Sequence, residues 1–166
     1  MEDLTVHYDH TVRNSSAGVV QFKYGDDSLD PVNIEVDDQP VEFTRALAHT
    51  LATLPAYDEP RLLPFQITKL LENFISKFSE NVSAQFQTSL RKFVNSNLVM
   101  PLAELRSALG LPPLVDEKVA PGEAFMDEGD GSRNVQLRFT ASHVQEFLKI
   151  CSDKYDKAQI EPGMFA

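Results

Sequence analysis

The sequence predicts an α+β fold that is mostly helical. Three observations predict it: an N-terminal β-rich segment interrupted by turn formers, four to five stretches with apolar residues at helical spacing, and one short β-rich stretch before the last of them. With 166 residues and 42% hydrophobic content, the chain is long enough to bury a core. We therefore expect an N-terminal β-hairpin, about four to five helices and one short strand before the last helix.

The expected hairpin lies within TVRNSSAGVVQFKYGDDSLDP, which begins at Thr11. The side chains of residues 11–13 alternate in direction before a run of turn formers, residues 14–18. A β-rich stretch, residues 19–24, then runs back, and Gly25 supplies backbone freedom where that strand ends. The hairpin and the acidic loop after it are expected to occupy residues 1–40.

Residues 41–114 are expected to be helical. Pro40 is placed for the first turn of a helix that runs to about Thr53. Its predicted apolar stripe comprises Phe43, Leu47, Leu51 and Leu54. Pro64 opens a second helix, the clearest periodic element, with apolar positions Ile67, Leu70, Leu71, Phe74, Ile75 and Phe78.

Two more helices are expected in this region. One covers residues 83–96, and a shorter one starts at Pro101 and is stopped by Gly110. The composition then changes to Pro, Gly, Asp and Glu, which predicts a flexible acidic loop over residues 115–134.

Residues 135–166 are expected to contain a short strand, residues 135–139, and the last helix. Thr140 can cap that helix by accepting a hydrogen bond from an exposed backbone amide. The predicted buried stripe of the helix comprises Val144, Phe147, Leu148, Cys151, Tyr155 and Ala158.

The net charge of −10 argues against direct contact with nucleic acid, because a protein that neutralises phosphates presents Lys and Arg. The charge is uneven: residues 1–40 hold nine Asp or Glu against two basic residues, whereas residues 61–100 hold five Lys or Arg against two Glu. The second stretch is the better candidate for a phosphate contact, although dispersed charges of this kind usually belong to solvated helix faces. No apolar run is long enough to predict a membrane partner.

No motif predicts a catalytic, cofactor-binding or metal site. The carboxylates of Asp26, Asp27 and Asp30 lack the alternating spacing of a calcium loop, and the acidic residues within 127–130 form an equally incomplete pattern. The four histidines, His7, His10, His49 and His143, show no zinc spacing with Cys or Glu. Cys151 is the only cysteine, so an internal disulfide is excluded, and its place on the apolar stripe predicts a buried, inert thiol.

Two stretches resemble the largest subunit of the multisubunit DNA-directed RNA polymerases. Within residues 11–31, TVRNS, VVQF, YGDD and LDP resemble the segment after the bridge helix, and they are more similar to nuclear RNA polymerase III than to polymerase II. Residues 142–163, SHVQEFLKICSDKYDKAQIEPG, resemble the helix and Pro-Gly turn that lead into the trigger loop. Ser28 stands where that family usually has Gly, which predicts a strained turn.

The resemblance implies a fragment of such a subunit. Residues 1–40 would follow the bridge helix, residues 41–114 would correspond to the foot, and residues 135–166 would lead toward the trigger loop. The metal-binding DFDGD loop and the trigger-loop motif of the family are absent from this sequence. The chain would thus be a structural part of the machine that makes RNA from ribonucleoside triphosphates on a DNA template, and it would be inactive alone.

The resemblance also implies partners, cofactors and a location. The partners would be other polymerase subunits, including the second-largest, with DNA and RNA contacted only through the complete enzyme. The complete subunit would bind magnesium and zinc, but this chain would bind no cofactor. The location would be the nucleus.

The candidate site residues are structural signature positions of the resemblance rather than catalytic groups. They are Thr11, Arg13, Asn14, Gln21, Phe22, Tyr24, Gly25, Asp27, Asp30, Pro31, Phe147, Tyr155, Pro162 and Gly163. Arg13 and Gln21 are hypothesised to fix the hairpin against the bridge helix or the second-largest subunit, with ordinary surface polarity as the alternative. The alternative for the whole chain is a free-standing acidic helical protein-binding module, whereas no motif supports a small hydrolase.

Overall fold

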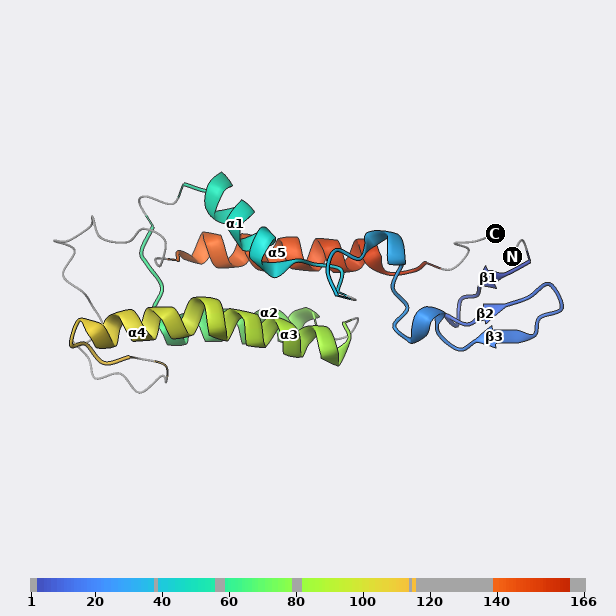
Figure 1. Ribbon diagram of the computed structural model, residues 1–166, viewed down its shortest axis with the longest axis horizontal. Coiled ribbons are helices and arrows are strands. Elements are labelled where there is room, and N and C mark those ends of the chain that lie inside the picture. Colours follow the sequence, from blue (N-terminus) through green and yellow to red (C-terminus); the bar gives the residue numbers. More distant parts are fainter. Residues whose placement is uncertain are drawn as a thin grey trace. The chain divides into compact units, whose positions relative to one another are not determined.

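The computed structural model describes residues 3–37, 39–55, 59–78, 82–113, 115 and 139–161. The chain forms two compact units: unit 1 comprises Met1–Glu42 and Cys151–Ala166, and unit 2 comprises Phe43–Ile150. The elements of both units are labelled in Figure 1. Among the described residues, no helix is long and apolar enough to cross a membrane.

Unit 1 contains a small antiparallel sheet with the strand order β1-β2-β3. The strands are β1, Thr5–Val6, β2, Val12–Arg13, and β3, Val19–Gln21, so the expected hairpin is confirmed. The sequence did not predict β1, because two residues carry no measurable periodicity. The returning strand is also shorter than expected, since it ends at Gln21 and a 3₁₀ turn, η1, Tyr24–Asp26, follows.

The core under this sheet joins the beginning and the end of the chain. Val6, Val12 and Ile160 are buried together, with Leu4 and Tyr24 packed against them. A second 3₁₀ turn, η2, Pro31–Asn33, follows the acidic loop. Two backbone hydrogen bonds tie that loop to the chain end: Asp30 N–H donates to Ala158 O at 2.8 Å, and Ile160 N–H donates to Ser28 O at 3.1 Å.

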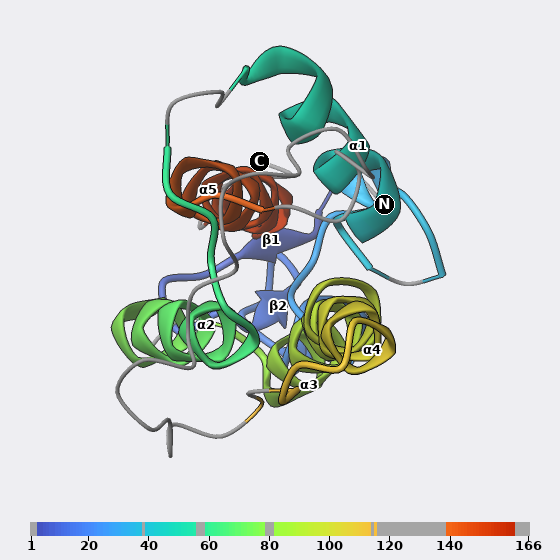
Figure 2. The ribbon, with the colours of Figure 1, turned by 90° about the vertical axis from the view of Figure 1, so that its left-hand side faces the viewer.

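Unit 2 is helical. Its helices are α1, Phe43–Thr53, α2, Pro64–Phe78, α3, Ala84–Val94, and α4, Met100–Ala108, together with the first part of α5, Ala141–Ala158. The end-on view in Figure 2 shows α2 beside α3 and α4. Aromatic rings form the centre: the ring centroid of Phe93 lies 5.3 Å from that of Phe43 and 5.9 Å from that of Phe147.

The second helix confirms the sequence prediction, whereas α1 corrects it. In α2 the residues Ile67, Leu71 and Ile75 are buried, as the spacing predicts. Helix α1 begins at Phe43, three residues after Pro40, and its buried residues are Phe43, Ala46 and Thr50.

The predicted leucine stripe of α1 was therefore wrong. Leu51 is 36% exposed, and Leu47 and Leu54 are only half-buried. The face was decided by Phe43, whose ring packs on Phe86 and Phe93. The buried hydroxyl of Thr50 is satisfied because it donates to Ala46 O at 2.9 Å.

The third and fourth helices, expected to be separate, form one continuous rod. A π-helical turn, η3, Asn95–Val99, joins them, and the flanking Val94 and Met100 keep helical backbone angles. Pro101 has no amide hydrogen, and its ring excludes the carbonyl four residues earlier from an ordinary α-helix. The wider π turn that precedes Pro101 makes room for the proline ring and leaves out the missing hydrogen bond, so the helix continues.

The predicted outer boundaries of this rod, a start near Ser83 and a stop at Gly110, are confirmed, whereas the predicted end at residue 96 and start at Pro101 are not. Ser83 caps α3, because its hydroxyl accepts from Phe86 N–H at 3.3 Å. Gly110, with φ of 75°, ends α4. Gly110 N–H donates to Ser107 O and Leu111 N–H donates to Arg106 O, the hydrogen-bond pattern of a Schellman motif.

The predicted last helix is confirmed as α5, and its whole predicted stripe is buried. His143 N–H donates to Thr140 Oγ1 at 3.4 Å, which is the expected cap. Of the expected strand, residues 135–138 lie outside the described residues, and Thr140 forms an isolated antiparallel bridge with Arg61. Of the loop expected over residues 115–134, all but Val115 lies outside the described part of the chain, as do the signature residues Pro162 and Gly163.

Candidate functional site

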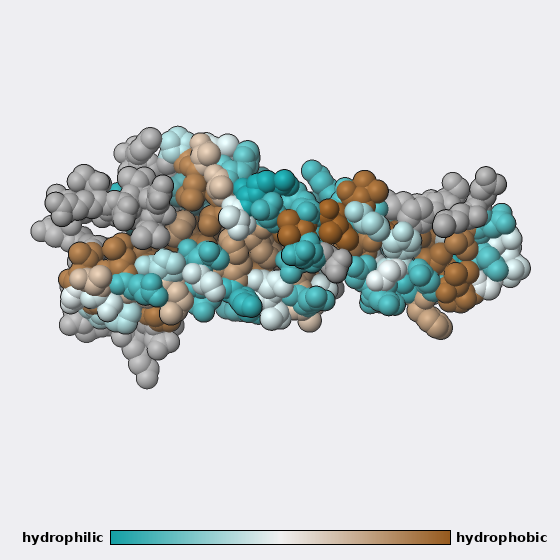
Figure 3. All heavy atoms as spheres, viewed as in Figure 1, coloured by the Kyte–Doolittle hydropathy of each residue, from teal (hydrophilic) through white to brown (hydrophobic). Residues whose placement is uncertain are grey.

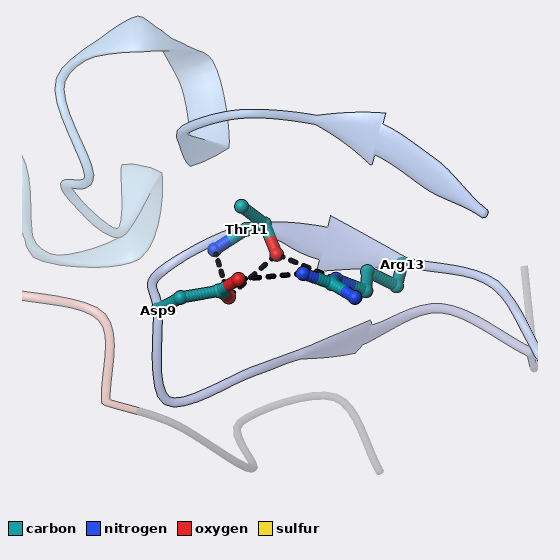
Figure 4. A network of polar contacts seen from close by, with 3 residues as sticks. All are labelled: Asp9, Thr11 and Arg13. Carbon is teal, nitrogen blue, oxygen red and sulfur yellow. Dashed lines mark hydrogen bonds and ion pairs between the residues drawn. The ribbon is translucent and has the colours of Figure 1, made fainter. Parts of the chain in front are cut away.

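The hairpin of unit 1 carries a network of three polar side chains, Asp9, Thr11 and Arg13 (Figure 4). The Thr11 hydroxyl donates to Asp9 Oδ1 at 2.6 Å and accepts from Arg13 Nε at 2.9 Å. The Arg13 guanidinium also donates to Asp9 Oδ2 at 2.6 Å, and the backbone amide of Thr11 donates to the same carboxylate. The turn between β1 and β2 is thereby fixed to the face of β2.

This network lowers the pKa of the Asp9 carboxyl group to about 2. The hydrogen bond from the Thr11 hydroxyl is the largest cause, followed by the Thr11 amide and then by Arg13, because each favours the charged form. Arg13 is thus engaged within its own hairpin. The hypothesis that Arg13 also contacts the bridge helix or the second-largest subunit stays a prediction. The same is true of Gln21, which is exposed.

The turn of the hairpin is held by Asn14. Its side-chain oxygen accepts from Gly18 N–H at 2.8 Å and from the Ser16 hydroxyl at 3.0 Å. Ala17 adopts φ of 61°, and a Cβ on Gly18 would lie only 3.2 Å from Asn14 Oδ1. The signature residue Asn14 therefore shapes the loop, and Gly18 leaves room for it.

The acidic loop uses its carboxylates to hold its own backbone. Asp27 Oδ1 accepts from Leu29 N–H at 2.9 Å, and Asp30 Oδ1 accepts from Val32 N–H at 3.1 Å as the cap of η2, in which Pro31 is the first residue. Side chains hydrogen-bonded to local amides in this way make Asx turns. Within the part of the chain that the structure describes, no three His, Cys, Asp or Glu side chains are grouped to hold a metal ion.

The backbone of this loop turns left-handed at three positions. Gly25 has the left-handed φ of 56° that its predicted backbone freedom allows, although it lies within η1 and not at the end of β3. Asp26 and Ser28 have φ of 66° and 62°. Left-handed geometry is unfavourable for residues with a Cβ. Ser28 therefore occupies a position that favours glycine, which fits the strained turn predicted there.

Apolar side chains are exposed around the same sheet. Tyr8 is 93% exposed, Phe22 81%, Val20 52% and Val19 45%. Figure 3 shows hydrophobic residues gathered at the surface over this region. Exposed apolar side chains that gather in this way are typical of an interaction surface.

The two aromatic signature residues of α5 lie in the interior instead. Phe147 is 0% exposed and Tyr155 is 3% exposed. Their side chains support the fold, so they cannot contact a partner directly. Cys151 is buried as predicted, and burial raises the pKa of its thiol, which keeps it protonated.

Three polar contacts between distant residues were missed by sequence reasoning. In unit 1, Lys154 Nζ donates to Glu35 Oε1 at 2.7 Å. The Glu35 side chain is also held locally, because its Oε2 accepts from Glu42 N–H at 2.9 Å. In unit 2, His143 Nε2 lies 2.8 Å from Leu54 O, and Ser142 donates to Glu59 and lowers the pKa of that carboxyl group. Partners separated by more than 80 positions leave no signal in spacing or composition.

Nearly the whole chain, 98% of it, aligns with a segment of the largest subunit of a DNA-directed RNA polymerase in several eukaryotes. By sequence, therefore, the chain belongs with the largest subunits of these polymerases. These relatives are RNA polymerase III subunits: identity is 33% to the RNA polymerase III subunit RPC1 of Debaryomyces hansenii, and 34% to those of Schizosaccharomyces pombe and Homo sapiens. No protein-family model matches the chain.

The chain spans only a small part of these relatives, namely 13% of the Debaryomyces hansenii subunit, 12% of the Schizosaccharomyces pombe subunit and 11% of the human subunit. The alignment with the first covers 194 positions, more than the 166 residues of this chain, so that relative carries inserted residues in this segment. The alignment with the human subunit covers 168 positions. The resemblance read from the two signature stretches is confirmed.

Proposed function

We propose that the chain is a structural segment of an RNA polymerase III largest subunit, and that it anchors neighbouring catalytic elements and presents surface to other subunits in the nucleus. The observation that carries the proposal is the alignment of 98% of the chain with such subunits. RNA synthesis and the magnesium ions that it uses would belong to the assembled enzyme. This chain would bind neither magnesium nor zinc.

The construction of unit 1 supports the anchoring role. Residues 1–42 and 151–166 form one unit, although 108 residues of unit 2 separate them in the sequence. Ile160 completes the core of the hairpin, and backbone hydrogen bonds join Ser28 and Asp30 to the chain end. In a longer subunit, the element before the hairpin and the element after α5 would thus be held at one place. We propose that these elements are the bridge helix and the trigger loop, with the helices of unit 2 as the foot.

Affinity purification of the tagged chain from its own cells, at native abundance, tests the proposal. We expect the other RNA polymerase III subunits, including the second-largest, to co-purify in stoichiometric amounts and to elute with the chain as one large complex. A chain that elutes alone, unfolds cooperatively and brings no polymerase subunit would overturn the proposal and favour the free-standing binding module.

Replacing Phe147 and Tyr155 is a poor test of assembly. Both side chains are buried, so their loss would destabilise the fold whatever the chain binds. Exposed positions are needed to separate binding from folding.

A further inference from the structure

The outer edge of β3 is open. The sheet order is β1-β2-β3, and among the described residues no strand pairs with β3 on the side away from β2. All three residues of β3 are exposed, and neither a charged residue nor a proline lies within Val19–Gln21. Natural proteins usually protect such edges with charges, prolines or a covering element, because an open edge pairs readily with another strand.

Two aromatic side chains of the hairpin are exposed, and one of them, Phe22, adjoins this edge strand in the sequence. Phe22 directly follows β3 and is 81% exposed, and Tyr8 in the turn between β1 and β2 is 93% exposed. Large exposed aromatic residues next to an open edge are typical anchors of protein interfaces. Main-chain pairing would supply affinity along β3, and a pocket for Phe22 would supply specificity.

The charge beside the edge indicates the chemistry of the partner. The loop after β3 carries Asp26, Asp27 and Asp30 against Lys23, whereas the Asp9 carboxylate is already neutralised by Arg13. A segment that docks here gains electrostatic complementarity if it carries Lys or Arg. An acidic segment would be repelled.

We propose that β3 is the docking edge for an extended, basic segment of another polymerase subunit, which adds as a fourth strand and receives Phe22 in an apolar pocket. The inference rests on the proposed function. It differs from that function in naming one strand, one anchor residue and the chemistry of the partner.

Photo-crosslinking in the purified assembly tests the partner. A photoreactive phenylalanine analogue replaces Phe22, and the control replaces Val32, which is 88% exposed in the same unit. We expect the position 22 probe to label one segment rich in Lys and Arg in another subunit, and the position 32 probe not to label it. Labelling of an acidic segment, of a second copy of this chain or of no subunit would overturn the inference.

Hydrogen exchange and one exposed substitution test the mode of binding. The amides of Val19–Gln21 should exchange slowly in the assembly and at least tenfold faster in the isolated chain, because added strand pairing protects them. Phe22→Lys should weaken retention of the crosslinked subunit by roughly 30-fold, the loss expected for an interface anchor. Unchanged exchange at β3 in the assembly would exclude strand addition.

The outcomes separate the two proposals. If the unsubstituted chain co-purifies with polymerase subunits and Phe22→Lys retains them all equally, the inference fails and the proposed function stands. If the unsubstituted chain brings no polymerase subunit, the proposed function itself fails.

Discussion

Unit 2 buries Phe43, Phe86 and Phe147 at its centre, whereas the sheet of unit 1 exposes Phe22 and Tyr8. Phe43, Phe86, Phe93 and Phe147 are in ring contact inside unit 2. In unit 1, Phe22 and Tyr8 face solvent, and the sheet rests on a cluster of only three buried residues. The difference teaches that the helical unit is held together by its own aromatic core, whereas the hairpin relies more on polar contacts and leaves an apolar surface exposed, the surface proposed above as a docking edge.

The comparison predicts the largest difference for two phenylalanines. Phe147→Ala should lower the free energy of unfolding by about 3–5 kcal/mol, because it opens a cavity in a closed aromatic core. Phe22→Ala, the matched control, should change it by less than about 0.5 kcal/mol, since that side chain is already in water. Urea unfolding of both variants measures this, and equal losses would show that the hairpin surface is buried in the isolated chain.

A smaller loss is expected for the core of the sheet. Val12→Ala should cost about 1.5 kcal/mol, because two methyl groups of a residue that is 4% exposed are removed. The control is Val32→Ala, at a valine that is 88% exposed in the same unit. Faster hydrogen exchange of the amides of β1 and β2 reports the loss. An unchanged exchange rate in Val12→Ala would mean that the small cluster does not stabilise the sheet.

The Glu35–Lys154 contact ranks next. Both side chains are less than a third exposed, at 21% and 30%, and they are 2.7 Å apart. A double-mutant cycle with Glu35→Gln and Lys154→Met should give a coupling free energy of about 0.5–1 kcal/mol. The Glu146–Lys149 pair is longer, at 3.9 Å, and more exposed, so it should give a smaller coupling. The reverse order would contradict the view that the ends of the chain are held by polar contacts.

A gain of stability is expected at the acidic loop. Ser28→Gly should stabilise the chain by about 0.5 kcal/mol, because relief of left-handed backbone strain exceeds the entropy that glycine adds to the unfolded chain. Gly25→Ala, at φ of 56°, should have the opposite sign. Thermal unfolding of the two variants compares them directly. A lower melting temperature for Ser28→Gly would contradict the claim that Ser28 is strained.

The polar network of the hairpin predicts a dependence of its stability on pH rather than a large contribution to the free energy of unfolding. The pKa of Asp9 falls from 3.8 to about 2 on folding, so the network stabilises the hairpin above about pH 4, and this contribution is lost as the pH falls toward 2. NMR titration of the Thr11 amide should therefore show a midpoint near 2. Asp9→Asn should remove this transition, and a midpoint near 4 in the unsubstituted chain would show that the network is not formed.

Sequence reasoning succeeded where the cause is local. The helical spacing from Ile67 to Phe78, the start of a helix near residue 83 and the glycine stop at residue 110 each depend on residues within a few turns of one helix, and all three predictions are confirmed. The signature stretches at residues 11–31 and 142–163 together identified the polymerase subunit that the chain matches.

Other features depended on partners far along the chain. The buried face of α1 was set by the ring of Phe43 against α3, and three leucines at helical spacing gave the wrong face. The fusion of α3 with α4 could not be foreseen either, because Pro101 is compatible both with a helix start and with a π turn.

By itself, then, the sequence determined the hairpin, most of the helices with several of their boundaries, and the polymerase subunit that the chain resembles. Capping, turn geometry and hydrophobic spacing act over a few residues, so they can be read from the order of amino acids. Only the tertiary structure decided that Ile160 completes the hairpin core, that Lys154 pairs with Glu35 and that Phe22 stays in solvent. These outcomes depend on which distant surfaces meet, and no short stretch of the sequence records that.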